Sequence, residues 1–329
     1  MTKLNVRPRS IPLSVLLICD ATIQSGSGHV MRQITLGAAL KSLGIEPILF
    51  CYSIPDALVV RAQEFQLTVQ KRSERCDSRK LSEEILSMKC DLAVFDGYDF
   101  LHDSISEVFY NDVKVVLIDD NGDLAKFPCH LVINQNLHAD AAMYASNETS
   151  PQLLLGLSWA MIRPEVVAQI NIVKMTEKSG ILLSIGGTDH LGITPVLRDG
   201  INQAFKEEVI ATTGVLTGGT LTPLDMAIMM SKSKVGIIAC GTTTWEAVCL
   251  SLPFVGLVTA DNQVEVGSSL VEYGIAQIVD CRSGFDIEMI LSKIRQLMTQ
   301  DSNIAERSIP LVDGGGALRS AHRIFSIIP

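Results

Sequence analysis

The chain has 329 residues, of which 47% are hydrophobic and 19% are charged. This length can form two domains of ordinary size, and the composition is typical of a globular α/β enzyme and argues against disorder. The formal net charge of −9 gives little support to a nucleic-acid partner, because that class of protein presents a basic face.

The eight cysteines include no C-x-x-C pair, which argues against a zinc knuckle or a thioredoxin-type site. Several lie in apolar runs, which favours buried free thiols in a reducing cytosol. The apolar run at residues 11–19 is similar to a short signal peptide, but Asp20 ends it and a glycine loop follows, so a buried first strand explains it better. No other apolar stretch approaches the length of about 18 residues that spans a membrane. We therefore predict a cytoplasmic protein.

In the first half of the chain, short apolar runs alternate with helical segments, which predicts βαβ units and a parallel sheet. Helices are expected at residues 30–43 and 79–88. The expected strands are residues 15–19, 46–52, 91–95, 113–118 and 130–134. Polar residues follow these strands, among them Asp20, Asp96 and the pair Asp119 and Asp120. Because open α/β sheets bind ligands at the carboxyl ends of their strands, these turns are expected to converge on one crevice.

The second half repeats this pattern, with helices expected from about residue 194, at 223–231 and through residues 245–246. The expected strands are residues 180–184, 208–213, 234–239 and 254–258. The stretch between about residues 145 and 178 is the predicted connection and hinge between a domain of residues 1–155 and a domain of residues 156–329.

The loop Gly26-Ser27-Gly28-His29 lies between the first predicted strand and the first predicted helix. Glycines let the backbone approach a ligand closely, and the free amides of a helix start favour an anion. The loop could also be only a tight turn with an exposed histidine. His29 favours a function, because imidazole suits acid–base work near neutral pH. Arg32, one helical turn later, could hold a phosphate or orient a carboxylate, or could simply be solvated.

Two loops of the second half each join a strand to a helix through glycine and threonine, as expected for a cradle that binds a nucleotide diphosphate. They comprise Gly186, Gly187 and Thr188 in one loop and Gly241, Thr242, Thr243 and Thr244 in the other. Thr242 or Thr243 could instead be a plain N-cap. Glu246 could cap its helix or accept hydrogen bonds from ribose hydroxyls. Asn262 and Gln263 follow a buried strand and suit either a turn or recognition of a transferred group.

These motifs resemble the UDP-sugar hydrolases of pseudaminic acid biosynthesis and their spore-coat polysaccharide relatives, which are similar in fold to the two-domain GT-B glycosyltransferases. The matching motifs occur in order across nearly the whole chain. They are residues 26–32 (Gly-Ser-Gly-His-Val-Met-Arg), 96–98 (Asp-Gly-Tyr), 118–120 (Ile-Asp-Asp), 133–136 (Ile-Asn-Gln-Asn), 155–156 (Leu-Gly), 162–164 (Ile-Arg-Pro), 184–189 (Ser-Ile-Gly-Gly-Thr-Asp), 241–246 (Gly-Thr-Thr-Thr-Trp-Glu), 252–253 (Leu-Pro), 261–263 (Asp-Asn-Gln) and 313–316 (Asp-Gly-Gly-Gly).

The resemblance implies two Rossmann-like domains that face each other across a cleft, and hydrolysis of a UDP-linked diacetamido deoxysugar. Water would attack the anomeric carbon with inversion, and no metal or cofactor would be needed. His29 would handle the attacking water, and Tyr98 would line the sugar pocket. The substrate-binding residues expected from the loops and the resemblance together are Asp20, Gly28, Arg32, Tyr98, Gly186, Gly187, Thr242, Thr243, Glu246, Asn262 and Gln263.

The sequence also departs from the family pattern. Cys19 stands where the family usually has Arg, Gln33 where it has Cys, and His190 where it has Pro. These departures leave two alternatives to hydrolysis, namely a GT-B glycosyltransferase that uses a UDP-amino sugar donor and a nucleotide-sugar-binding protein without turnover. The oligomeric state does not follow from the sequence.

Overall fold

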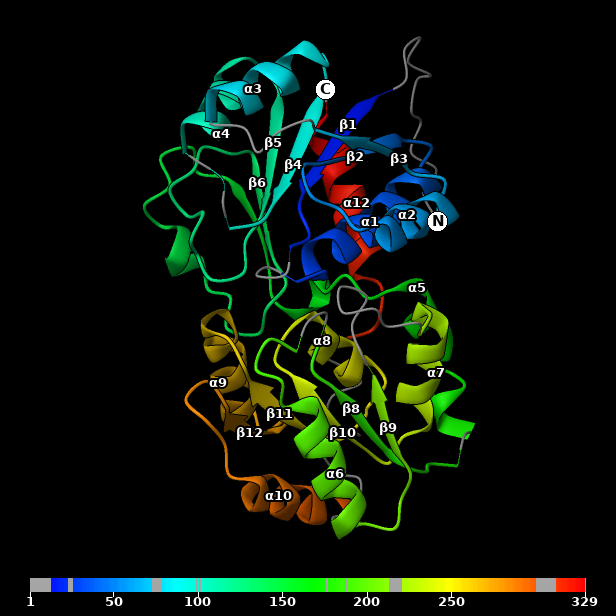
Figure 1. The fold of residues 1–329 in the computed structure, drawn as a ribbon. Helices are drawn as coiled ribbons and strands as arrows, with labels where there is room; N and C mark the ends of the chain where they lie inside the picture. Colours follow the sequence, from blue (N-terminus) through cyan, green and yellow to red (C-terminus); the bar gives the residue numbers. More distant parts are fainter. Residues whose placement is uncertain are drawn as a thin grey trace.

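The computed structural model describes residues 13–22, 26–72, 78–98, 100, 102–175, 177–186, 189–212, 221–299 and 312–328. Within these residues the chain forms two parallel β-sheets, one of seven strands and one of five. Each sheet is flanked by helices, and the two layered units lie one above the other in Figure 1.

The first sheet has its central strands buried on both faces, which explains why their sequences are continuously apolar. Its strands are β1 (Ser14–Cys19), β2 (Glu46–Cys51), β3 (Thr68–Lys71), β4 (Leu92–Asp96), β5 (Lys114–Ile118), β6 (Leu131–Asn134) and β7 (Gln152–Leu155), in the order β3-β2-β1-β4-β5-β6-β7. Cys19 pairs in register with Asp96, and Asp96 with Ile118. The residues that follow β1, β4 and β5 therefore meet at one edge of the sheet.

The helices and turns that accompany the first sheet are α1 (Gly28–Ser42), α2 (Asp56–Glu64), α3 (Ser78–Ser87), α4 (His102–Tyr110), η1 (Ala141–Tyr144) and η2 (Leu157–Trp159). Helix α1 starts directly after the glycine loop, so His29 and Arg32 lie in its first two turns. The loop thus brings the start of α1 to the edge at which β1 and β4 end.

The second sheet places β10 at its centre, in the order β12-β11-β10-β8-β9. Its strands are β8 (Ile181–Ser184), β9 (Val209–Thr212), β10 (Val235–Ala239), β11 (Phe254–Val258) and β12 (Gln277–Asp280). The surrounding helices are α5 (Pro164–Gln169), η3 (Val173–Met175), α6 (Thr194–Ala204), α7 (Pro223–Lys232), α8 (Thr242–Cys249), η5 (Asp261–Gln263), α9 (Val264–Glu272) and α10 (Ile287–Thr299), and α12 (Gly316–Ile327) follows them in the chain. Helix α8 begins where the central strand ends, which puts its first turn at the carboxyl edge of this sheet.

These sheets confirm the predicted α/β architecture with two Rossmann-like units. The predicted connection at residues 145–178 is partly wrong, because β7 lies inside it and pairs in parallel with β6. Helix α12 returns to the first sheet and lies beside α1 (Figure 1). Its residues Ala317, Ala321 and Ile324 belong to the core of that sheet. The division of the chain at residue 155 stays a proposal, and α12 packs with the N-terminal unit.

The seven cysteines in the described residues are free and buried, as expected for structural thiols. No helix in the same part of the chain is long and apolar enough to cross a membrane.

Candidate active site between the two sheets

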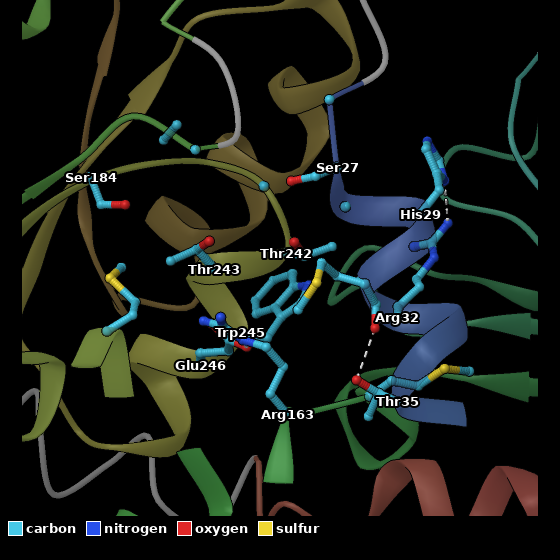
Figure 2. A pocket seen from close by; sticks show the side chains of 18 of the residues that line it. Ser27, His29, Arg32, Thr35, Arg163, Ser184, Thr242, Thr243, Trp245 and Glu246 are labelled. Atoms are coloured by element: carbon cyan, nitrogen blue, oxygen red, sulfur yellow. Dashed lines mark hydrogen bonds and ion pairs between the residues drawn. The ribbon is translucent and has the colours of Figure 1, made fainter. Parts of the chain in front are cut away.

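A cavity of about 540 Å³ lies between the carboxyl edges of the two sheets. The starts of α1 and α8 both line it, through Ser27 and His29 and through Thr242 and Thr243. Figure 2 shows the two helix starts close together, with the His29 side chain on the side of α1 away from Thr242 and Thr243. A β-carbon added to Gly28 would lie 3.4 Å from the hydroxyl of Thr242, so glycine permits this close approach of the two helices.

On the N-terminal wall, His29 and Asp96 form a buried pair. Nδ1 of His29 lies 2.6 Å from Oδ1 of Asp96, and their side chains are 7% and 0% exposed. An ionised carboxylate only accepts hydrogen bonds, so Nδ1 carries the proton and donates it. Nε2 is then the ring nitrogen with a free lone pair. This is the arrangement in which a histidine can act as a base.

Arg32 bridges two carboxylates behind this pair. Its guanidinium donates to both oxygens of Asp96, at 2.7 and 2.6 Å, and to both oxygens of Asp120, at 2.7 and 3.0 Å. Burial alone would lower the pKa of Arg32, but the charges and hydrogen bonds of Asp120 and Asp96 raise it above its ordinary value. Of the roles considered for Arg32, orientation of a carboxylate is therefore the one that these contacts support.

The three aspartates that follow β4 and β5 do different things. Burial raises the pKa of Asp96 and of Asp120, but the charge of Arg32 and hydrogen bonds outweigh it, and both pKa values lie below the ordinary range. Asp119 instead accepts backbone N–H groups of the loop at residues 121–124, and its pKa is raised by burial and by the charge of Asp120. Only Asp120 of the adjacent pair lines the cavity.

The C-terminal wall presents backbone and hydroxyl groups rather than charges. Gly241 is the N-cap of α8 and, within the described residues, no side chain caps this end of the helix. The amides of the first helical turn have no acceptor in the helix, and they carry the positive end of the helix dipole. The start of α8 is therefore suited to bind an anion such as a diphosphate.

Glu246 lies below this turn and is held by Arg163, which donates to both carboxylate oxygens through Nε and Nη2. Both side chains line the cavity. The carboxylate counteracts the effect of burial and raises the pKa of Arg163. Because each charge neutralises the other, this pair adds no net charge to the wall.

Ten of the predicted site residues line the cavity: Gly28, His29, Arg32, Tyr98, Gly186, Thr242, Thr243, Glu246, Asn262 and Gln263. Gly187 lies outside the described residues. Asp20 is not among the lining residues, and its Oδ1 accepts the backbone N–H groups of Tyr52 and Ser53 at 2.6 and 2.9 Å. The structure thus shows Asp20 holding the loop after β2, and it does not support the predicted contact with substrate.

Several lining residues have partners that sequence reasoning did not assign. The sequence predicts Arg163 and Asn136 only as members of matching motifs, without partners. Asn136 accepts the indole N–H of Trp245 at 3.1 Å and donates to Oδ1 of Asp120 at 3.0 Å. Membership of a motif does not identify partners far away in the chain.

The known proteins to which the chain is similar share little sequence identity with it. No protein-family model matches it. It is 20% identical to the spore coat polysaccharide biosynthesis protein SpsG of Bacillus subtilis, over 93% of this chain and 96% of SpsG. Among solved structures, Acinetobacter baumannii MurG has a TM-score of 0.65 at 12% identity, covering 96% of this chain and all of MurG. A UDP-GlcNAc 2-epimerase from Neisseria meningitidis also gives 0.65 at 12% identity, over 95% of this chain and all of the epimerase.

The fold is GT-B-like. The chain is also a distant homologue of SpsG. Both statements agree with the resemblance seen in the sequence motifs, and the predicted fold class is confirmed.

Proposed function

We propose that the chain hydrolyses a UDP-linked deoxy-diacetamido sugar and releases UDP, in the biosynthesis of a nonulosonic (pseudaminic-type) acid or a surface polysaccharide. One observation carries the proposal: His29 of the buried His29–Asp96 pair and the uncapped start of α8 line a single cavity. A base for water and a site for a diphosphate lie on opposite walls, as a hydrolytic displacement needs.

The comparisons support a nucleotide-sugar substrate. SpsG is named for polysaccharide biosynthesis, and the structure of the epimerase contains UDP-GlcNAc. Both matches extend over nearly the full length of this chain, so they include both walls of the cavity.

In the proposed reaction, Nε2 of His29 accepts a proton from a water molecule as the water oxygen bonds to the anomeric carbon. The bond from that carbon to the diphosphate oxygen breaks, and its electron pair leaves with UDP. Arg32, Asp96 and Asp120 together carry one net negative charge. Once His29 has accepted the proton, the net charge of these four side chains is zero.

The leaving diphosphate is assigned to the start of α8, where backbone amides can stabilise the charge that develops on it. Thr243, Asn262 and Gln263 would contact UDP and the sugar, and Glu246 would accept hydrogen bonds from the ribose. UDP is a good leaving group, so the acid member of a glycosidase's carboxylate pair is less necessary.

One observation favours a transferase as the second candidate. The cavity is also lined by α2, through Leu58, the half-exposed Val60, Arg61 and Glu64, together with Met31 of α1. This part of the cavity could hold an acceptor in place of water.

The test is incubation with UDP-linked diacetamido sugars in water enriched in oxygen-18. Hydrolysis predicts UDP and a free sugar that carries the label at its anomeric oxygen. Release of UDP only after addition of an acceptor would establish transfer. Binding of UDP without release of UDP or free sugar from the UDP-sugar would indicate a nucleotide-sugar-binding protein without turnover.

His29→Ala is the companion variant. Loss of the general base is expected to lower kcat at least a hundredfold while the affinity for UDP, measured by calorimetry, stays within threefold. Turnover that survives within a few-fold would remove His29 from the mechanism.

A further inference from the structure

Two hydrogen bonds cross the cavity between the sheets, and both reach residues that bind Asp120. The indole N–H of Trp245 donates to Oδ1 of Asn136 at 3.1 Å. The amide of Asn262 donates to the hydroxyl of Tyr98 at 3.2 Å. Asn136 and Tyr98 belong to the N-terminal wall, whereas Trp245 and Asn262 belong to the C-terminal wall. A single carboxylate is therefore the common anchor of both crossings.

Asp120 is fully used as an acceptor. Its Oδ1 receives Arg32 Nη1 at 2.7 Å and Asn136 Nδ2 at 3.0 Å. Its Oδ2 receives Arg32 Nη2 and the Tyr98 hydroxyl, both at 3.0 Å. An ionised carboxylate offers about four acceptor positions, and all four are occupied here. Tyr98 can donate to Asp120 and accept from Asn262 at once, so the chain of hydrogen bonds is continuous.

The same anchor reaches the catalytic pair. Arg32, which Asp120 holds through two bonds, also donates to both oxygens of Asp96, and Asp96 accepts the Nδ1 proton of His29. We propose that Asp120 is a positioning residue that couples the docking of the second sheet's loops to the orientation of the His29–Asp96 pair. This inference rests on the proposed function for its effect on turnover, but the coupling itself does not.

Asp120→Asn is a sharp probe because it changes almost no volume. The new NH₂ group must face Arg32 together with either Asn136 or Tyr98, and all of these are donors toward it. One bond to Arg32 must be lost, and the bond that supports one crossing, from Asn136 or from Tyr98, must be lost or reversed. Asp119→Asn is the matched control, since it removes a neighbouring buried carboxylate that accepts from its own loop and from Tyr144 and does not line the cavity.

Two readouts are combined. The first is turnover of the UDP-sugar, with kcat and KM determined separately, beside the affinity for UDP. The second is acrylamide quenching of Trp245, which is 2% exposed, in a Trp159→Phe background that leaves it as the single tryptophan. Asp120→Asn is expected to lower kcat about tenfold to a hundredfold, with KM and UDP affinity within threefold. It is also expected to raise quenching, whereas Asp119→Asn changes neither kcat nor quenching.

Unchanged kcat and quenching in Asp120→Asn would overturn the proposal, as would equal losses in Asp119→Asn. If the unmodified protein turns over no UDP-sugar, the proposed function fails and quenching still decides the coupling. In that case Asn136→Ala and Asp120→Asn are compared singly and together. Equal quenching in the double and single variants supports one shared connection. Additive effects would show that Asp120 does not act through Asn136.

Discussion

The two walls of the cavity bury polar groups in opposite ways. On the N-terminal wall, fixed side-chain charges do the work, because Arg32 is 3% exposed and holds two ionised aspartates beside His29. On the C-terminal wall, the start of α8 offers amides and threonine hydroxyls, and the charges of Glu246 and Arg163 cancel. The N-terminal wall can change its protonation, whereas the C-terminal wall offers a dipole that does not titrate.

This difference indicates a division of labour within one site. A base must gain and lose a proton, so it needs carboxylates that fix its tautomer and compensate its charge. A cradle for a diphosphate must not depend on protonation, and helix amides meet that requirement. Substitutions on the first wall should therefore reduce kcat, and substitutions on the second should reduce affinity for UDP.

The largest effect is expected for Asp96→Asn. If the remaining oxygen keeps its bond with Nε of Arg32, the new NH₂ points at Nδ1 of His29 and forces the proton onto Nε2. A histidine in that tautomer cannot accept a proton from water, so kcat should fall at least a hundredfold with UDP affinity unchanged. Steady-state kinetics and calorimetry measure the two quantities. Asp103→Asn, at an exposed position, is the control, and a kcat within threefold would contradict the assignment.

The second prediction concerns the other wall and uses Thr242→Pro. Thr242 occupies the first helical position, where proline is tolerated, and Gly241 before it is already extended. The variant keeps the helix but removes one amide donor, so UDP affinity should fall about tenfold or more. Thr242→Ala keeps that amide and should bind UDP within a few-fold of the parent. Similar losses in both variants would assign binding to the hydroxyl.

The third prediction concerns the pH dependence of the stability that Asp96 and Asp120 contribute on the N-terminal wall. The pKa values of Asp96 and Asp120 lie below those of the unfolded chain, near 3.9. Their contribution to stability is therefore fully present above about pH 4 and is lost as pH falls toward the folded pKa values. In urea titrations between pH 5 and pH 3, the parent should lose up to about 1.4 kcal/mol per pH unit more than Asp120→Asn. Parallel curves would contradict this.

Much of the fold followed from apolar runs that end in polar residues, as β11 shows, because a strand buried on both faces is continuously apolar. Several elements were not predicted in this way, and β7 and α12 show why. The four residues of β7 stand between Pro151 and Gly156, a composition typical of a connection. Helix α12 packs on α1, which precedes it by more than 270 residues, and its amphipathic pattern fits either sheet equally well.

The site, like the fold, could be predicted only where the sequence signal is local. Glycine and threonine at strand ends identified both helix starts, because backbone conformation restricts those residue types locally. The pairings depend on register instead: Cys19 lies opposite Asp96, and this alone brings Asp96 to His29. The pair of Arg163 and Glu246 spans 83 residues and has no local signal. Asp20 shows the second role that a strand-end aspartate can have, since it holds the loop after β2.

The smallest expected effect tests whether the burial of polar side chains on α1, the helix that carries His29 and Arg32, depends on hydrogen-bond partners. Gln33 follows Arg32 in α1 and is 0% exposed, yet neither its amide oxygen nor its amide nitrogen has a partner in the described part of the chain. A buried amide without hydrogen bonds destabilises the folded state. Gln33→Met, which has a similar shape, should therefore raise the free energy of unfolding by about 1 kcal/mol in urea titrations. Arg32→Met leaves the carboxylates of Asp96 and Asp120 without their buried cation and should lower the free energy of unfolding. If Gln33→Met also lowered it, Gln33 would have a hydrogen-bond partner.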